Sequence, residues 1–294
     1  MDLGLKDKIA LVAGSSRGLG YATALALAKE GCKVAINGRD EAKIKSAAEK
    51  LSRETGAQVI GVAGDVGLRD VPAQLVAQTV EAFGGLDILI TNSGGPKPGA
   101  FESHDEANWQ NAIDLSLMSH VRLIRAALPH LRRSSTASVL TVTSYSVKQP
   151  IPNLVLSNSV RAATVGLTKS LALELGRDGI RFNSILPAWT ETERVYELMT
   201  NRAQANATSV EQEIAPMTSD ELEAQEAARE KVMADLRAKG IDPRSEEGRQ
   251  AMMGVMGGAM PERFNRVQME FVAPEKTYTQ DVGPIETDIQ TENY

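Results

Sequence analysis

The sequence has almost no cysteine, no long apolar run and no excess of basic residues. Cys32 is the single cysteine in 294 residues, so no disulfide can form within the chain, and a reducing compartment is favoured. We interpret Cys32, which stands just before an apolar run, as a small buried hydrophobic residue. No segment is long and apolar enough to cross a bilayer, and Met1–Gly4 does not resemble the start of a signal peptide. These absences predict a cytoplasmic protein with no membrane partner.

The charge balance is acidic rather than basic. A net charge of −6 and a pI near 5.3 argue against a nucleic-acid-binding surface, so no nucleic acid is expected as a partner. Internal repeats are absent, and no spacing of His, Cys, Asp and Glu indicates a metal site. With 42% hydrophobic residues, the chain can bury a full core, as one domain or as one domain with an appendage.

Short apolar runs alternate with segments of helical periodicity along the first two thirds of the chain. The runs predict strands over residues 9–12, 33–37, 58–62, 88–92, 138–143 and 180–186. Helices of ordinary length between them imply parallel pairing through right-handed crossovers. We therefore predict an α/β fold with a doubly wound parallel sheet of six strands, similar to a Rossmann fold. Ligands bind such sheets beyond the carboxyl ends of the strands.

Three glycines follow the first predicted strand, as Gly14-x-x-x-Gly18-x-Gly20, and a helical pattern begins directly after them. Such a strand–turn–helix presents backbone N–H groups and a helix N-terminus to an anion, usually a phosphate. A side chain at these positions would block the turn or the approach of a pyrophosphate. Tight turns explain many glycine triplets, but here the flanking strand and helix that the motif requires are both present.

The second predicted strand is followed by Asn37-Gly38-Arg39, without the carboxylate that would bind ribose hydroxyls and favour NAD. Arg39 and Arg17 could together hold a 2′-phosphate, because a guanidinium offers paired donors. Taken alone, Arg39 is equally well explained as a solvated surface charge. The pair of arginines leads us to expect NADP(H).

The next two predicted strands end in residues suited to the rest of a dinucleotide. Asp65 follows the third strand, where its carboxylate could accept a hydrogen bond from the adenine amino group. The small residues of Asn92-Ser93-Gly94 follow the fourth strand and would let a ribose approach closely.

At this point the chain resembles the short-chain dehydrogenase/reductase family, over about Leu5 to Glu193. The motifs that carry the resemblance are residues 13–20, 65–66, 91–94, 143–144 and 186–190, and the chain is most similar to 3-oxoacyl-carrier-protein reductase-like members. The resemblance implies a small-molecule substrate that is a carbonyl compound or an alcohol. The cofactor-binding residues that we predict are Gly14, Ser16, Arg17, Gly18, Leu19, Gly20, Gly38, Arg39, Asp65, Val66, Asn92, Ser93, Gly94, Arg161, Pro187, Ala188, Thr190 and Thr192.

The catalytic residues depart from the family pattern. The family uses a Tyr-x-x-x-Lys pair, in which the lysine lowers the pKa of a proton-donating tyrosine. Here Ser157 stands at the tyrosine position and Arg161 at the lysine position, while Ser116 replaces an asparagine on the preceding helix. Ser144, the residue that polarises the carbonyl in the family, is retained. We therefore take Ser144, Ser157 and Arg161 as the candidate catalytic residues.

The source of the proton is left open by these replacements. Ser157 is a poor general acid, because its alkoxide is too basic to form without a neighbouring base. Tyr145 is one alternative, although Tyr145 and Lys148 are three residues apart in a loop and cannot reproduce the helical pair. Water or a substrate group is another.

The resemblance ends near Glu193, and the chain beyond residue 214 matches nothing that we recognise. We predict a dinucleotide-binding domain with its substrate loop over residues 1–214 and a divergent extension over 215–294. The extension opens on a helix over Thr218–Lys239, has a possible edge strand over 267–272, and is polar and loosely ordered beyond Pro274.

Two functions are consistent with these sequence features. The first is an NADP(H)-dependent oxidoreductase with an incomplete catalytic tetrad, acting on a carbonyl or secondary alcohol such as a 3-oxoacyl group. The second is a catalytically silent NADP(H)-binding sensor or scaffold; a third, a fused or altered chain with a compromised final strand, explains only the unusual C-terminus. For either of the first two we expect a homodimer through the helices of residues 109–131 and 159–175, with a tetramer as the alternative.

Overall fold

The computed structural model of the chain describes residues 2–190, 192–214, 230–242, 245 and 251. The chain divides into two compact units, Met1–Ala215 and Pro216–Tyr294, and each is considered by itself. In the second unit, residues 230–238 are helical, within the helix predicted over 218–239. The start of that predicted helix, the edge strand over 267–272 and the polar segment beyond Pro274 lie outside the described residues. The boundary after residue 214 stays a prediction.

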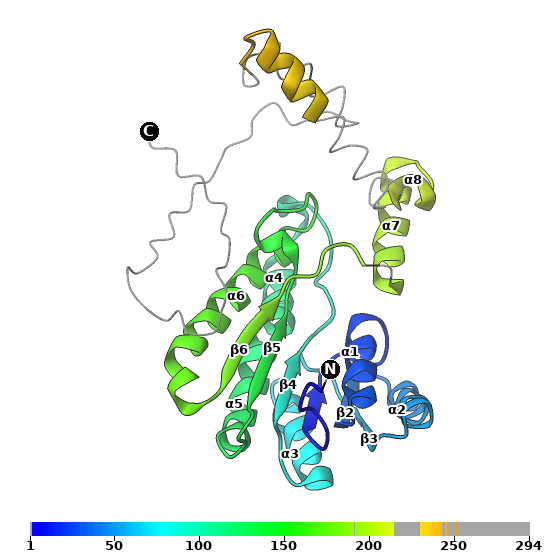
Figure 1. Cartoon of the computed structure of the whole chain (residues 1–294). Coiled ribbons are helices and arrows are strands. Elements are labelled where there is room, and N and C mark those ends of the chain that lie inside the picture. Colours follow the sequence, from blue (N-terminus) through cyan, green and yellow to red (C-terminus); the bar gives the residue numbers. More distant parts are fainter. Residues whose placement is uncertain (1, 191, 215–229, 243–244, 246–250, 252–294) are drawn as a thin grey trace. The chain divides into compact units, whose positions relative to one another are not determined.

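The first unit contains a parallel sheet of six strands in the order β3-β2-β1-β4-β5-β6 (Figure 1). The strands are β1 (Ile9–Val12), β2 (Lys33–Gly38), β3 (Val59–Ala63), β4 (Ile88–Thr91), β5 (Ser138–Val142) and β6 (Arg181–Ile185). All five pairings between neighbouring strands are parallel. The chain therefore forms the doubly wound, Rossmann-like α/β sheet that its alternating pattern predicts.

Helices cover both faces of this sheet. The helices that pack on its strands are α1 (Gly18–Lys29), α2 (Glu41–Thr55), α3 (Val71–Phe83), α5 (Ser119–Leu131) and α6 (Val155–Leu175). The first unit also contains α4 (Glu106–Ile113), α7 (Glu193–Asn206) and α8 (Val210–Ile214). Successive side chains of a strand point to opposite faces, so Leu11 joins one buried cluster while Ala10 and Val12 join the other. The first cluster includes residues of α3 and α5, and the second includes residues of α1 and α2.

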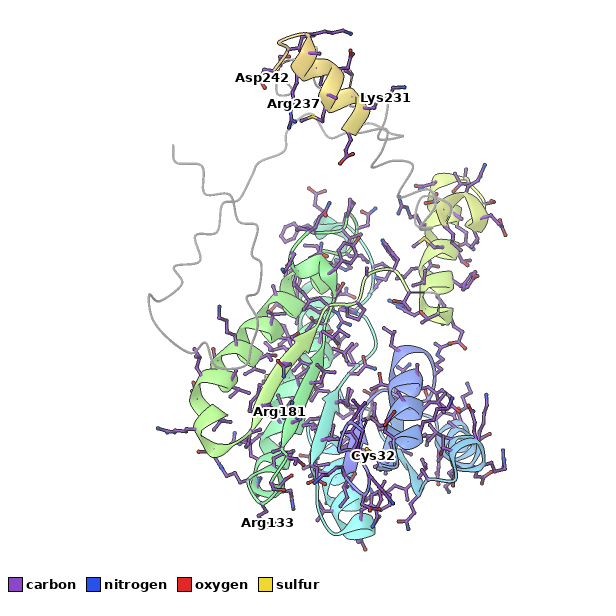
Figure 2. All side chains as sticks on the ribbon, in the orientation of Figure 1. Cys32, Arg133, Arg181, Lys231, Arg237 and Asp242 are labelled. Atoms are coloured by element: carbon purple, nitrogen blue, oxygen red, sulfur yellow. The ribbon has the colours of Figure 1, made fainter. Side chains whose placement is uncertain are left out.

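Cys32 lies in the second cluster and is 1% exposed, which agrees with its interpretation as a buried hydrophobic residue (Figure 2). Its thiol donates to the carbonyl oxygen of Leu5 at 3.2 Å. Burial raises the pKa of the Cys32 thiol to about 11, so the reactive thiolate is disfavoured at neutral pH.

The periodic segment over residues 109–131 is two helices rather than one. A π-helical segment, η2 (Asp114–Met118), separates α4 from α5. At its centre, the carbonyl oxygen of Ser116 accepts a hydrogen bond of 2.6 Å from the Thr164 hydroxyl of α6. The irregular segment is thus bonded to the neighbouring helix through a side-chain hydroxyl.

A buried asparagine near the end of β2 is bonded to the loop that follows β1 and to the end of β3. The Asn37 side chain accepts a hydrogen bond from the Gly14 N–H at 3.2 Å. It donates to the carbonyl oxygens of Val62 and Gly64 at 3.1 and 3.0 Å. The Asn37 backbone N–H also donates to the Ser15 hydroxyl at 2.9 Å. Asn37 is 1% exposed, so water cannot replace these bonds.

We expect Asn37→Ala to lower the free energy of unfolding by about 2–4 kcal/mol, because it leaves buried backbone groups without partners. Urea unfolding followed by circular dichroism measures the change. The matched control is Asn183→Ala, which removes an exposed strand asparagine. Equal midpoints for the two variants would show that the Asn37 contacts contribute little.

Candidate functional site

A cavity of about 420 Å³ lies where the carboxyl ends of the strands meet. Its lining comes from the segments that follow all six strands, together with residues of α6 and of the first turns of α7. Every residue predicted to bind the cofactor or to act in catalysis lines this cavity: Gly14, Ser16, Arg17, Gly18, Leu19, Gly20, Gly38, Arg39, Asp65, Val66, Asn92, Ser93, Gly94, Ser144, Ser157, Arg161, Pro187, Ala188, Thr190 and Thr192. The fold thus brings together residues far apart in the sequence. Their roles in binding and catalysis stay predictions.

The glycine loop between β1 and α1 is shaped for a close approach. Gly14 and Gly18 have φ angles of +56° and +59°, which residues with a side chain rarely adopt. A Cβ on Gly20 would collide with the carbonyl oxygen of Gly14. Helix α1 has neither a side-chain cap at its N-terminus nor an acidic residue in its first turn. Its first N–H groups are therefore available to an anion, as a dinucleotide phosphate requires.

The two arginines predicted to bind a 2′-phosphate stand on adjoining loops. A Cβ on Gly38 would lie 3.0 Å from the Cβ of Ser16, so the loops after β1 and β2 are in contact. Arg39 is exposed and forms no ion pair with any described residue. Arg17 is paired: its Nη2 lies 2.9 Å from the Glu197 carboxylate of α7.

The residues predicted near adenine and ribose also hold the loops in place. Asn92 donates from its side-chain amide to the carbonyl oxygen of Gly14 at 3.0 Å, which supports the glycine loop from β4. The Asp65 carboxylate accepts from the backbone N–H of Gly67 at 2.9 Å. These bonds fix the backbone of the cavity wall before any ligand binds.

Arg161 is the most buried cation of the site. It is 7% exposed, and its Nη1 donates to the carbonyl oxygens of Val142 and Thr143 at 3.2 and 3.1 Å. Its Nη2 lies 3.4 Å from the carbonyl oxygen of Gly94. No described carboxylate pairs with it. Burial, and to a smaller degree the Arg194 guanidinium, lowers the pKa of Arg161 to about 10, so it remains protonated at neutral pH.

Ser144 and Tyr145 follow β5 at the same end of the cavity. The Ser144 hydroxyl oxygen accepts from the Ser146 N–H at 3.2 Å, and Tyr145 begins a short 3₁₀ turn, η3 (Tyr145–Val147). Tyr145 lines the cavity, whereas Lys148 is exposed and does not. The loop therefore offers Tyr145 to the site without a lysine partner.

His120 lies beneath this end of the site and is 1% exposed. Its Nδ1 is 2.7 Å from the Thr91 hydroxyl oxygen. Burial, and then the Arg161 charge, lowers the pKa of His120 to about 3, so the ring is neutral at physiological pH. His120 packs within the protein and does not line the cavity.

Sequence reasoning missed three residues of this region. The sequence shows Asn37 only as a position without a carboxylate, and it does not indicate that Arg194 and Glu197 of α7 belong to the site. Arg194 and Glu197 line the cavity, and Trp189 lines it as well. Charged residues on an exposed helix carry no sequence signal that separates a cavity wall from a solvated face.

The described residues hold no group of three or more His, Cys, Asp or Glu side chains arranged to bind a metal ion. In the same part of the chain, no helix has both the length and the apolar character needed to span a membrane.

This fold defines an α/β protein of the doubly wound class, with a cavity at the carboxyl ends of its strands. The family model for short chain dehydrogenase matches residues 8–203, which is most of the first unit. The chain therefore belongs to the short-chain dehydrogenase family, as the resemblance of its motifs implies.

Relatives within the family are oxidoreductases. The chain is 33% identical to Dehydrogenase/reductase SDR family member 4 of Bos taurus, over 64% of this chain and 67% of that protein. Among solved structures it is similar to L-sorbose reductase of Gluconobacter frateurii complexed with NADPH and L-sorbose, with a TM-score of 0.69, 29% identity and coverage of 78% and 84% of the two chains. A short chain dehydrogenase of Burkholderia cenocepacia in complex with NADP matches with a TM-score of 0.61 and 29% identity, over 65% of this chain and 77% of that chain.

We expect Gly20→Ala to weaken dinucleotide binding at least tenfold and to destabilise the fold, because its Cβ collides with the glycine-loop backbone. Calorimetric titration with NADPH and thermal unfolding measure the two effects. Gly166→Ala is the control, since a Cβ there meets no atom within 4 Å and removes only helix flexibility. Unchanged binding in Gly20→Ala would mean that the loop is not the phosphate site.

Proposed function

We propose that the protein is an NADP(H)-dependent oxidoreductase that acts on a carbonyl compound or secondary alcohol, with 3-oxoacyl compounds among the candidates. One observation carries the proposal: a single cavity joins the uncapped N-terminus of α1 to Ser144 and Arg161. The structural relatives named with NADPH or NADP support the same cofactor class.

The end of β2 favours the phosphorylated cofactor over NAD. Asn37, the last residue but one of the strand, turns its side chain inward to accept from the Gly14 N–H, and Gly38, which ends the strand, offers no carboxylate to a ribose. Arg39 follows, exposed at the cavity without an ion-pair partner among the described residues. An unpaired guanidinium at this position suits a 2′-phosphate.

The catalytic end combines one hydroxyl donor with one buried cation. A bound nicotinamide would supply or accept the hydride. The Ser144 hydroxyl would donate a hydrogen bond to the substrate oxygen, and the positive charge of Arg161 would favour negative charge developing there. Ser157 lies one helical turn before Arg161 on α6 and also lines the cavity. The proton would come from Tyr145 or from water.

The alternative is a catalytically silent NADP(H)-binding sensor or scaffold. The observation that favours it is the use of Arg161, whose three hydrogen bonds all go to backbone carbonyl oxygens. In that case the cation stabilises the ends of β4 and β5, and no acid is available at the site.

We further propose a cytoplasmic homodimer through the faces of α4, α5 and α6, with a tetramer as the alternative. Leu173 of α6 is 70% exposed and would be covered in such a dimer. The dinucleotide-binding domain would extend over residues 1–214.

We expect NADPH to bind at least tenfold more tightly than NADH, and Arg39→Ala to remove most of this preference. Titration of tryptophan fluorescence, confirmed by calorimetry, measures both affinities; Trp189 lines the cavity and serves as the reporter. The control is Arg53→Ala, because Arg53 is exposed on α2 and does not line the cavity. The absence of saturable NADPH binding would contradict both the oxidoreductase and the silent module.

For an oxidoreductase, Ser144→Ala should lower kcat about 100-fold, which is the usual loss on removing one donor to a developing oxyanion. The rate of NADPH oxidation with a panel of ketones and 3-oxoacyl thioesters measures kcat. The control is Ser170→Ala, because Ser170 is exposed on α6. If the natural chain binds NADPH without turnover and Ser157→Tyr with Arg161→Lys creates turnover, the silent module is the correct function.

A further inference from the structure

An acidic side chain of α7 contacts two arginines at the rim of the cavity. One carboxylate oxygen of Glu197 lies 2.9 Å from Nη2 of Arg17, and the other lies 3.5 Å from Nη1 of Arg194. Glu193 adds a weaker approach to Arg17, at 3.9 Å. All four side chains line the cavity.

This arrangement links α7 to both walls of the site. Arg17 lies in the glycine loop, 180 residues before Glu197. Arg194 donates from Nη2 to the carbonyl oxygen of Pro96, which follows β4, at 3.3 Å. The hydrogen bond from Arg17, with smaller contributions from the Arg17 charge and from Arg194, keeps the pKa of Glu197 below its ordinary value. Glu197 is therefore an anion at neutral pH.

Arg17 is also the residue that immediately precedes α1, at its uncapped N-terminus. Ser16 beside it touches Gly38, so the loop that carries Arg39 adjoins the same place. A phosphate entering there would meet an unpaired Arg39 but an Arg17 already engaged with a carboxylate. If Arg17 held both, the phosphate and Glu197 would repel each other as like charges.

We propose that Glu197 is a specificity-determining residue, which competes with a cofactor phosphate for Arg17. This inference rests on the proposed NADP(H)-dependent function. Binding of the phosphate transfers Arg17 from Glu197 to the cofactor and releases one of the links between α7 and the glycine loop. Because the 2′-phosphate is the group that Arg39 also faces, Glu197 reduces the preference for NADPH over NADH.

The competition is modest in size. The side chains of Arg17 and Glu197 are 57% and 46% exposed, so water and salt screen their attraction. The interaction free energies of solvent-exposed ion pairs correspond to a change in affinity of about two- to fivefold. Such a change is measurable by calorimetry and should decrease as the salt concentration rises.

The test compares Glu197→Gln with the natural chain in calorimetric titrations with NADPH and NADH. Glutamine keeps the size of the side chain and removes its charge. We expect NADPH to bind about two- to fivefold more tightly and NADH to be unaffected. An equal gain for both cofactors would assign the competing group as the pyrophosphate, and would remove the effect on specificity. An unchanged or weaker affinity for NADPH overturns the competition.

Glu211→Gln is the matched control, because it makes the same change in net charge on α8, away from the cavity. A gain of the same size in this variant would show that overall charge, not the contact with Arg17, is responsible.

A second measurement needs no cofactor. Hydrogen exchange of the first turns of α7 should be faster in Glu197→Gln and in Arg17→Ala than in the natural chain, and unchanged exchange would show that the pair does not hold α7. Adenosine 2′,5′-bisphosphate then probes the 2′-phosphorylated adenosine half of the cofactor without the nicotinamide half, and it should bind Glu197→Gln about two- to fivefold more tightly. If the natural chain binds neither NADPH nor this nucleotide, the proposed function fails, and the competition fails with it. If it binds both and Glu197→Gln does not bind them more tightly, only the competition is wrong.

Discussion

The close packing of the glycine loop against its neighbours is the constraint on which the rest of the site depends. The Gly14 N–H is bonded by Asn37 from β2, and the Gly14 carbonyl oxygen is bonded by Asn92 from β4. Gly20 then approaches so closely that no Cβ fits. Since the loop is held from within the sheet by side chains, the N–H groups at the start of α1 are left without protein partners. A rigid loop with free donors is a preorganised anion site, and little entropy is lost when a phosphate binds it.

The buried Arg161 shows how the fold accommodates a charge without a carboxylate. Its Nη1 reaches two successive carbonyl oxygens at the end of β5, and Nη2 approaches one beyond β4. Carbonyl oxygens carry partial negative charge, so they replace part of the hydration that burial removes. The lowered pKa of Arg161 indicates that this replacement is incomplete. The cation is therefore both a structural tie between two strand ends and a source of positive potential inside the cavity.

Much of the fold and part of the site could be predicted from sequence, for a physical reason. The burial of side chains repeats with a short period along a strand or a helix, so each of the six strands is visible in the local sequence pattern. The residues expected to face a ligand then follow the strand ends. The contact of the π-helical segment with α6 could not be predicted, because the Thr164 hydroxyl that bonds the Ser116 carbonyl oxygen lies 48 residues away. The role of Asn37 depends on the loop after β1 and the end of β3, and the pairing of Arg17 with Glu197 joins distant segments. Periodicity carries no information on such contacts.

The two ends of the cavity therefore differ in how strongly the sequence determines their function. Phosphate binding uses backbone N–H groups, glycines and exposed arginines, all of which the loop geometry supplies whatever the substrate. Carbonyl chemistry needs particular side chains at particular atoms, and there Ser157 and Arg161 replace the pair that the family uses. Glu197 lies on α7 and pairs with Arg17 of the glycine loop, so α7 is linked to this end of the cavity. Under the competition that we propose, preference for a cofactor depends on three elements, the glycine loop, the β2 loop and α7, rather than on the glycine motif alone.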